Sequence, residues 1–311
     1  MLDFSKNAFT GTMPQNLSSL RGLVKLNFEY NRLGNEDVGG LNFLGFLANF
    51  TSLKALGFGC NQFWGVLPNS IANLSSQLNI LTMSGNMIYG SVSIGIGNLV
   101  NLTILGLEEN NLEGLIPEAL GKLQQLHVLV MSSNKFSRQI PSSFGNLTTL
   151  TILSMEETRL EGSIPPSLGN YQNLLSLSLS NNNLNGTIPK QVIGLSSLSI
   201  SFAMSHNSLT SKLPFKVGNL KNLGELDLLE NRLLGEIPAS LGSCISLERL
   251  QLEGNSFEGA IPPSLKILRT LQEIDLSRNN LLGQIPEFLS KFISLKHLNL
   301  SHNNFDGNVP T

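Results

Sequence analysis

Histidine and cysteine, the side chains most often used in catalysis and metal binding, are sparse in this sequence. The histidines are His127, His206, His297 and His302, and the cysteines are Cys60 and Cys244. In the repeat pattern set out below, His302 lies roughly 19 Å from His206 and roughly 16 Å from His297, so neither pair can bind one metal ion. The two cysteines, roughly 34 Å apart, cannot form a disulfide. We therefore predict no catalytic residue, metal site, disulfide or cofactor, and we expect Cys244 to be buried as a small apolar residue.

A group of glutamates offers a different chemistry, the binding of a basic ligand. Glu108 and Glu109 should lie about 10 Å from Glu156 and Glu157 across a predicted sheet. Apolar residues accompany them, which suits a short peptide with a basic end and an apolar segment. The candidate ligand-binding residues are Ile104, Glu108, Glu109, Val128, Val130, Ser132, Ile152, Glu156 and Glu157. The alternative interpretation is that exposed glutamates only keep the surface soluble.

A second charged region mixes positive and negative side chains. It contains Glu225, Asp227, Glu230, Arg249, Glu253, Glu273, Asp275 and Arg278. Because the signs are mixed, we predict ion pairs within the protein rather than a ligand site.

An asparagine that returns every 24 residues determines where all these side chains lie. It occupies positions 7, 31, 61, 86, 110, 134, 182, 207, 231, 255, 279 and 303, and Thr158 fills the one remaining place. The steps are 24 residues, apart from two of 25 and one of 30. The chain is therefore a repeat protein, and we expect residues 1–311 to form a single domain of about thirteen repeats.

Each repeat has a pattern that predicts local structure. Apolar and variable residues alternate in the segment L-x-x-L-x-L-x-x-N, which predicts one short strand per repeat. The strands of successive repeats should stack side by side as a parallel sheet. The asparagine should turn inward and form a hydrogen-bonded ladder, with a weaker rung at Thr158. The Gly-x-Ile-Pro that follows, as in Gly114 to Pro117, predicts a positive φ at glycine. The next residues predict a 3₁₀ or short helical turn on the outer side.

The combined string L-x-x-L-x-L-x-x-N-x-L-x-G-x-I-P-x-x-L-G-x-L resembles the plant-specific class of leucine-rich repeats over essentially all of the chain. The resemblance implies an α/β fold, a right-handed leucine-rich-repeat solenoid with a concave parallel sheet and a convex side of 3₁₀ and short helical turns. It also implies the extracellular part of a plasma-membrane receptor.

One irregular repeat, residues 33–53, lacks Gly-x-Ile-Pro and carries six extra residues. Together with Leu67-Pro-Asn-Ser-Ile71-Ala-Asn-Leu74, it resembles a receptor-kinase subfamily. That subfamily includes the plant receptors for bacterial flagellin and elongation factor Tu and a rice bacterial-blight resistance receptor. Phe50 stands where related sequences often carry cysteine.

Several parts that such receptors have are missing from this sequence. It shows no basic-then-apolar leader, no cysteine-paired end caps and no apolar run long enough to span a bilayer. The glycine-rich loop and His-Arg-Asp phrase of kinases are also absent. We therefore expect a fragment or truncated product that is not itself an enzyme, with any serine/threonine kinase activity belonging to the rest of the parent protein.

Composition and sequons narrow the choice of partner. The net charge of −2 argues against nucleic acid. Asn-x-Ser/Thr sequons, which favour a secreted glycoprotein, occur at Asn16, Asn49, Asn73, Asn101, Asn146, Asn185 and Asn299. Asn299 is unusual because it should lie on the inner sheet.

The leading hypothesis is the ligand-binding region of a plant receptor-like kinase, on the extracellular side of the plasma membrane. It would recognise a peptide or protein and pair with a co-receptor kinase of the same repeat class, in immune or developmental signalling. One alternative is a soluble leucine-rich-repeat protein similar to the polygalacturonase inhibitors. Another is that kinase activity is ascribed to the chain only through its parent protein.

Overall fold

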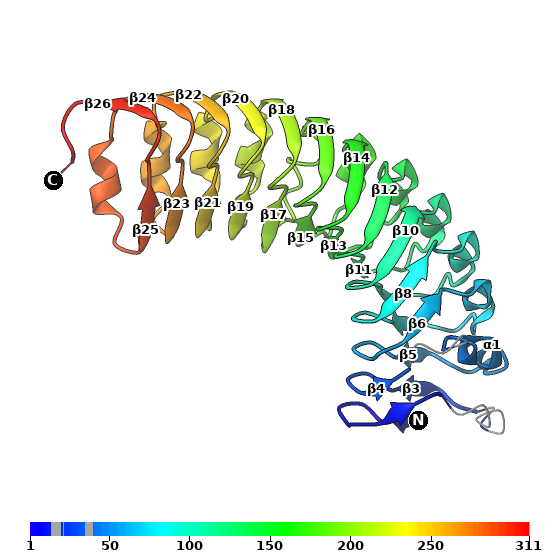
Figure 1. Ribbon diagram of the computed structural model, residues 1–311. Helices are drawn as coiled ribbons and strands as arrows, with labels where there is room; N and C mark the ends of the chain where they lie inside the picture. The colour runs from blue at the N-terminus through cyan, green and yellow to red at the C-terminus, as the bar shows by residue number, and fades with distance from the viewer. Residues whose placement is uncertain (14–19, 21, 35–39, 311) are drawn as a thin grey trace. The chain divides into compact units, whose positions relative to one another are not determined.

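The chain folds into two compact units, each a stack of similar coils (Figure 1). Unit 1 comprises Met1–Leu160 and unit 2 Glu161–Thr311. The computed structural model describes residues 1–13, 20, 22–34 and 40–310. No helix within those ranges is long and apolar enough to cross a membrane.

Each coil contributes one short strand to a parallel inner sheet, as the repeat pattern predicts. In unit 1 these strands are β1 (Leu2–Asp3), β3 (Lys25–Asn27), β5 (Ala55–Gly57), β7 (Ile80–Thr82), β9 (Ile104–Gly106), β11 (Val128–Val130) and β13 (Ile152–Ser154). In unit 2 they are β15 (Ser176–Ser178), β17 (Ser201–Ala203), β19 (Glu225–Asp227), β21 (Arg249–Gln251), β23 (Glu273–Asp275) and β25 (His297–Asn299). In most of these strands the central residue is a leucine that points into the core, and Leu105, Leu129 and Leu153 are 0% exposed. Phe202 and Ile274 take its place in β17 and β23, and Leu298 of β25 is exposed. The register is strict, because a one-residue slip would turn the buried leucines to the solvent.

The predicted asparagine ladder is confirmed, and Asn110 illustrates its bonds. Its Nδ2 donates to Met83 O of the preceding coil at 3.0 Å, and to Leu107 O and Glu108 O of its own coil at 3.1 Å. Its Oδ1 accepts from Ile88 N of the preceding coil at 3.1 Å. The amide is therefore paired on both its donor and acceptor sides within a buried turn.

Thr158 takes the place of this asparagine in one coil. Its hydroxyl donates to Met155 O at 3.3 Å, which corresponds to the bond from Asn110 to Leu107 O. A hydroxyl has one hydrogen to donate where the amide has two, so this turn holds fewer donors than its neighbours.

A second strand follows the asparagine in most coils, and sequence analysis did not predict it. In unit 1 these strands are β2 (Thr10–Gly11), β4 (Arg32–Leu33), β6 (Trp64–Val66), β8 (Met87–Gly90), β10 (Asn111–Leu115) and β12 (Lys135–Arg138). β14 (Arg159–Ser163) lies where the units meet in sequence, and unit 2 has β16 (Asn183–Thr187), β18 (Ser208–Lys212), β20 (Arg232–Glu236), β22 (Ser256–Gly259), β24 (Asn280–Gln284) and β26 (Asn304–Asp306). Neighbouring strands pair in parallel, as β8 does with β10.

The glycine of Gly-x-Ile-Pro lies at the end of this second strand and has the expected positive φ. The angle is +80° at Gly114 and +79° at Gly235. Arg138 and Ser211, which replace this glycine, keep positive φ values of 67° and 72°. The fold therefore holds two ordinary residues in a backbone conformation that favours glycine.

The outer side of each unit consists of 3₁₀ turns, as predicted. Unit 1 has η2 (Asn69–Asn73), η3 (Ile94–Asn98), η4 (Glu118–Lys122) and η5 (Ser142–Asn146), and unit 2 has η6 (Pro166–Asn170), η7 (Phe215–Asn219), η8 (Ala239–Ser243), η9 (Pro263–Ile267) and η10 (Glu287–Lys291). Adjacent turns approach closely at glycine. A Cβ on Gly121 would lie 2.5 Å from Ser143 O, so no side chain fits there.

The irregular repeat contains α1 (Phe43–Leu47), a short α-helix in place of a 3₁₀ turn. The Phe43 ring lies 5.3 Å from those of Phe58 and Phe63, and these contacts bury the apolar face of the helix. Phe50, just after the helix, is 0% exposed. The extra residues of this repeat thus supply a local aromatic core.

Candidate ligand-binding surface

The predicted ligand-binding residues lie on three neighbouring coils of unit 1, along the inner sheet. In the register of β9, β11 and β13, Ile104 is opposite Val128, which is opposite Ile152. Val130 lies two residues further along β11, between Gly106 and Ser154. These four apolar side chains are half-buried and share one face of the sheet. They form what we call the apolar row.

The glutamates fall into two further rows, one position apart. Backbone bonds from Glu109 N to Ser132 O and from Ser133 N to Glu156 O continue the ladder past the strands. One row is therefore Glu108, Ser132 and Glu156, and the other is Glu109, Ser133 and Glu157. Glu109 and Glu157 are exposed and have positive φ values of 54° and 51°. Glu157 Oε2 accepts a hydrogen bond from Ser133 Oγ at 2.8 Å.

Ser132, one of the predicted ligand-binding residues, bonds to other parts of the protein. It is only 6% exposed. Its hydroxyl lies 2.7 Å from Ser154 Oγ and accepts from Glu156 N at 3.2 Å. The side chain therefore links two coils and has a structural role as well as a place on the predicted ligand-binding surface.

Glu108 has the most unusual environment of the four glutamates. Its carboxylate folds back over Gly106, where a Cβ would lie 3.1 Å from Glu108 Oε2. Oε2 is buried, and no atom of the described residues donates a hydrogen bond to it. Burial raises the pKa of Glu108, and the charges of Glu109 and Glu29 raise it further, while a hydrogen bond from Ser84 lowers it. A buried carboxylate oxygen without a donor favours a ligand that brings one.

A fifth acidic side chain, Glu29, lies near Glu108 and was not predicted from the sequence. Glu29 lies over Gly57, where a Cβ would be 3.1 Å from its carboxylate, and its Oε1 accepts from Thr82 Oγ1 at 2.5 Å. Thr82 in turn lies in β7, directly opposite Gly106. The signal in the sequence was glycine at two variable strand positions. Gly106 leaves room for Glu108, two residues further on, to fold back across its own strand, and Gly57 leaves room for Glu29 of the preceding coil.

The predicted burial of Cys244 is confirmed. Cys244 is 0% exposed, its thiol donates to Val217 O at 3.2 Å, and burial raises its pKa to about 12. Burial also raises the pKa of Cys60, although a hydrogen bond with Tyr30 lowers it. Neither environment favours a reactive thiolate.

The second charged region, in unit 2, contains the predicted ion pairs. Arg249 Nη2 lies 2.9 Å from Glu225 Oε2. Arg278 pairs with both Glu230 and Glu253. These carboxylates are occupied by side chains of the protein itself, so the mixed-sign surface is a weaker ligand candidate than the glutamate rows.

The sequons differ in how accessible their amide nitrogens are. Exposed asparagines are Asn49, Asn73, Asn101, Asn146 and Asn185, and Asn16 lies outside the described residues. Asn299 lies in β25, where its Nδ2 donates to Asp275 Oδ2 at 2.9 Å and to Ser277 Oγ at 3.1 Å. Nδ2 is the atom that a glycan would modify. Asn101 Nδ2 also donates, to Ser76 O at 2.8 Å, but Asn101 is exposed, so the half-buried and twice-bonded Asn299 is the least suitable of the described sequons.

Known proteins share this repeat and this fold. Leucine rich repeat models match residues 100–160, and also residues 173–195, 246–268, 270–292 and 294–311. The LRR receptor-like serine/threonine-protein kinase EFR of Arabidopsis thaliana is 47% identical over 89 residues, which are 29% of this chain and 9% of that protein. Receptor kinase-like protein Xa21 of Oryza sativa subsp. japonica is 42% identical over 88 residues, 28% of this chain and 8% of that protein.

Among solved structures, the Arabidopsis receptor kinase HAESA superposes with a TM-score of 0.81 at 31% identity. The match covers 97% of this chain and 53% of the HAESA chain, whose crystal structure also contains the peptide hormone IDA and the co-receptor SERK1. The chain is therefore a leucine-rich-repeat solenoid protein. Its homologues are plant leucine-rich-repeat receptor kinases, and it matches about half of the HAESA chain and 8–9% of the two curated relatives.

Proposed function

We propose that this chain is a ligand-binding extracellular region of a plant receptor-like kinase, acting in immune or developmental signalling. Its ligand is a short peptide or protein segment with a basic residue next to apolar ones. The basic residue binds at Glu108, and the apolar residues lie along the apolar row of Ile104, Val128, Val130 and Ile152.

The observation that carries this proposal is the unpaired Oε2 of Glu108, the buried carboxylate oxygen described above. Leaving a charged oxygen without a donor is costly, so the free protein is destabilised at this point. An arginine or lysine from a ligand would supply the donor and the opposite charge together. The half-exposed apolar row beside it gives the rest of the peptide a surface to cover.

The comparisons support the same class of ligand and partner. The HAESA structure holds a peptide hormone and a co-receptor, and the relatives EFR and Xa21 are named as receptor kinases. By analogy, we place the protein on the extracellular side of the plasma membrane, with a peptide or protein ligand and a co-receptor kinase of the same repeat class as partners. The exposed sequons fit that location.

Replacing Glu108, Glu109, Glu156 and Glu157 together with glutamine tests the site. We expect weaker binding of a peptide that has arginine at one end and leucine and valine along its length, measured by isothermal titration calorimetry. The matched control changes four exposed glutamates away from the inner sheet, Glu113, Glu118, Glu236 and Glu258, and removes the same total charge. Circular dichroism should be the same for both variants.

Two results would refute the proposal. One is unchanged affinity in the inner-sheet variant. The other is an equal loss in the control variant, which would mean that only the net charge of the protein matters. The single Glu108→Gln change should account for most of the loss, because Glu109 and Glu157 are exposed to water and screened by salt.

A further inference from the structure

On the outer side of unit 2, successive 3₁₀ turns normally touch through a glycine and a small residue. A Cβ on Gly218 of η7 would lie 2.7 Å from Ser240 O of η8. A Cβ on Gly242 of η8 would lie 2.5 Å from Ser264 O of η9. Glycine at one side and serine at the other therefore allow the backbones to pack directly together.

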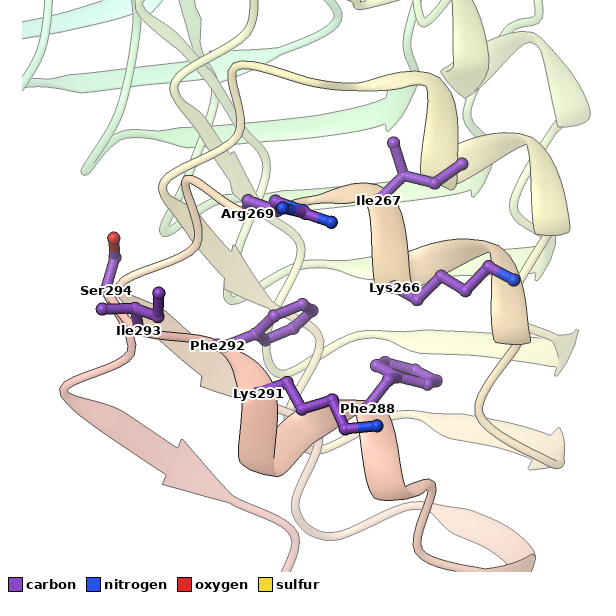
Figure 2. A pocket seen from close by; sticks show the side chains of 8 residues that line it. All are labelled: Lys266, Ile267, Arg269, Phe288, Lys291, Phe292, Ile293 and Ser294. Carbon is purple, nitrogen blue, oxygen red and sulfur yellow. The ribbon is translucent and has the colours of Figure 1, made fainter.

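The next pair of turns, η9 and η10, has neither the glycine nor the small residue at this contact. Lys266 of η9 takes the place of the glycine, and Phe288 of η10 takes the place of the serine. η8 packs against η9, but η9 does not pack against η10 in the same way. A cavity of about 720 Å³ lies between them, within the usual size range of ligand sites. Figure 2 shows the η9 side chains on one side of this cleft and those of η10 on the other.

The floor of the cleft is aromatic. The rings of Phe288 and Phe292 lie 5.8 Å apart at an interplanar angle of 54°. Phe292 is 8% exposed, so it belongs to the core and presents only one edge to the cleft. Ile267 lines the η9 side and is 54% exposed. Apolar groups thus face one another across an open space that the chain itself does not fill.

The rim of the cleft is basic. Lys266 and Arg269 come from the η9 side and Lys291 from η10. Within the part of the chain that the structure describes, no acidic side chain lines the cavity, and Glu287 at the start of η10 lies outside it. Among the described residues none of the three cations forms an ion pair, in contrast to Arg249 and Arg278 of the same unit. Three unpaired positive charges around an apolar floor attract an anionic partner that carries an apolar group.

We propose that this cleft between η9 and η10 binds an acidic peptide segment of a partner protein. An apolar side chain of the segment packs against Phe288, Phe292 and Ile267, and its flanking carboxylates pair with Lys266, Arg269 and Lys291. The exposed isoleucine favours a peptide side chain over a sugar ring, which would use the flat aromatic faces alone. This site does not depend on the ligand proposed for the inner sheet, because it lies in unit 2 on the outer turns.

The test uses a capped nine-residue peptide with four glutamates around a central Phe-Leu pair, labelled for fluorescence anisotropy with the full chain. A second peptide has lysine in place of each glutamate, and an oligogalacturonate serves as a carbohydrate of the same charge sign. The closing variant, Lys266→Gly with Phe288→Ser, restores the residue pair that packs η8 against η9. The charge variant, Arg269→Gln with Lys291→Gln, keeps the cleft. Its control is Lys216→Gln with Lys221→Gln, two exposed cations elsewhere on the outer side.

We expect the acidic peptide to bind, and the closing variant to lose binding while its thermal melting temperature stays the same or rises. The charge variant should weaken binding about fivefold or more, and its control should not. Binding should also weaken as salt is added. The proposal is overturned if the closing variant binds as well as the unchanged protein, if the lysine peptide binds equally, or if only the oligogalacturonate binds. A charge variant that binds as tightly as its control would overturn it as well.

Discussion

The asparagine ladder makes a quantitative prediction for Asn110→Ala. The change removes three bonds donated by Nδ2 and one accepted by Oδ1. The lost bonds differ in free-energy cost, because the three carbonyl oxygens that accept from Nδ2 each keep another donor. Met83 O also accepts from Asn86 Nδ2, Leu107 O from Asn134 Nδ2, and Glu108 O from Gly85 N. Ile88 N, by contrast, lies in β8 and loses the buried Asn110 Oδ1 that accepts its hydrogen bond.

The magnitude follows from that difference. An orphaned buried N–H costs about 1–3 kcal/mol, and each bond to a carbonyl that keeps another partner costs about 0.5–1.5 kcal/mol. Nδ2 has two hydrogens, so its three contacts count as about two bonds. We therefore expect Asn110→Ala to destabilise its coil by roughly 2–6 kcal/mol, with about half of it from Ile88 N, the largest single contribution.

Because single coils can unfold locally, stability should be measured both at individual coils and for the whole protein. Hydrogen exchange followed by mass spectrometry should show faster exchange in β8, which contains Ile88, and guanidinium unfolding should show the loss of stability. The control is Asn98→Ala, an exposed asparagine at the end of η3, which should change stability by less than about 0.5 kcal/mol. The reasoning is refuted if Asn110→Ala costs less than about 1 kcal/mol or leaves exchange in β8 unchanged.

Three further predictions concern other residues. Burial raises the pKa of the Glu108 carboxyl in the folded protein above its ordinary 4.5. The folded protein therefore keeps the carboxyl proton to a higher pH than the unfolded chain does. As pH rises through the pKa of the folded state, the protein loses stability. Glu108→Gln should therefore raise the melting temperature at neutral pH but not below pH 4.5, and an equal gain at both would contradict the cause. Ser211→Gly should stabilise unit 2 by roughly 0.5–1 kcal/mol in chemical unfolding because φ is 72° there, whereas Gly235→Ser should do the reverse. Cys244, with its pKa raised to about 12, should react with maleimide only on unfolding, and rapid labelling of the native protein would show that the site opens.

Much of the fold could be predicted from the sequence because the same residue pattern, with the same local interactions, recurs in every repeat. The inner strands, the asparagine ladder and the 3₁₀ turns each follow from a fixed residue type at a fixed position. The second strand was missed because residues such as Asn111–Leu115 include a glycine and show no clean alternation. Their pairing arises only when coils are stacked, as in the register of Leu112 with Gly90.

The candidate site was less predictable for a related reason. The pattern places Glu108 on the inner sheet, but it does not say that the carboxylate folds back over Gly106 and becomes buried. Nor does it indicate that Ser132 bridges to Ser154. Both contacts depend on which small residues of neighbouring coils lie beside the side chain. Predicting them therefore requires the stacked arrangement of the coils as well as the repeat pattern.

The ladder also has a direction along the chain. Asn207 accepts from Leu184 N and donates to Leu179 O, both in the coil before it. A coil's backbone is thus satisfied by a side chain that is synthesised about one repeat later. During translation, each coil should remain incomplete until the next asparagine has emerged from the ribosome. Folding of the nascent protein would then advance one repeat behind synthesis, so a stalled ribosome would always hold one coil with an exposed, unpaired backbone.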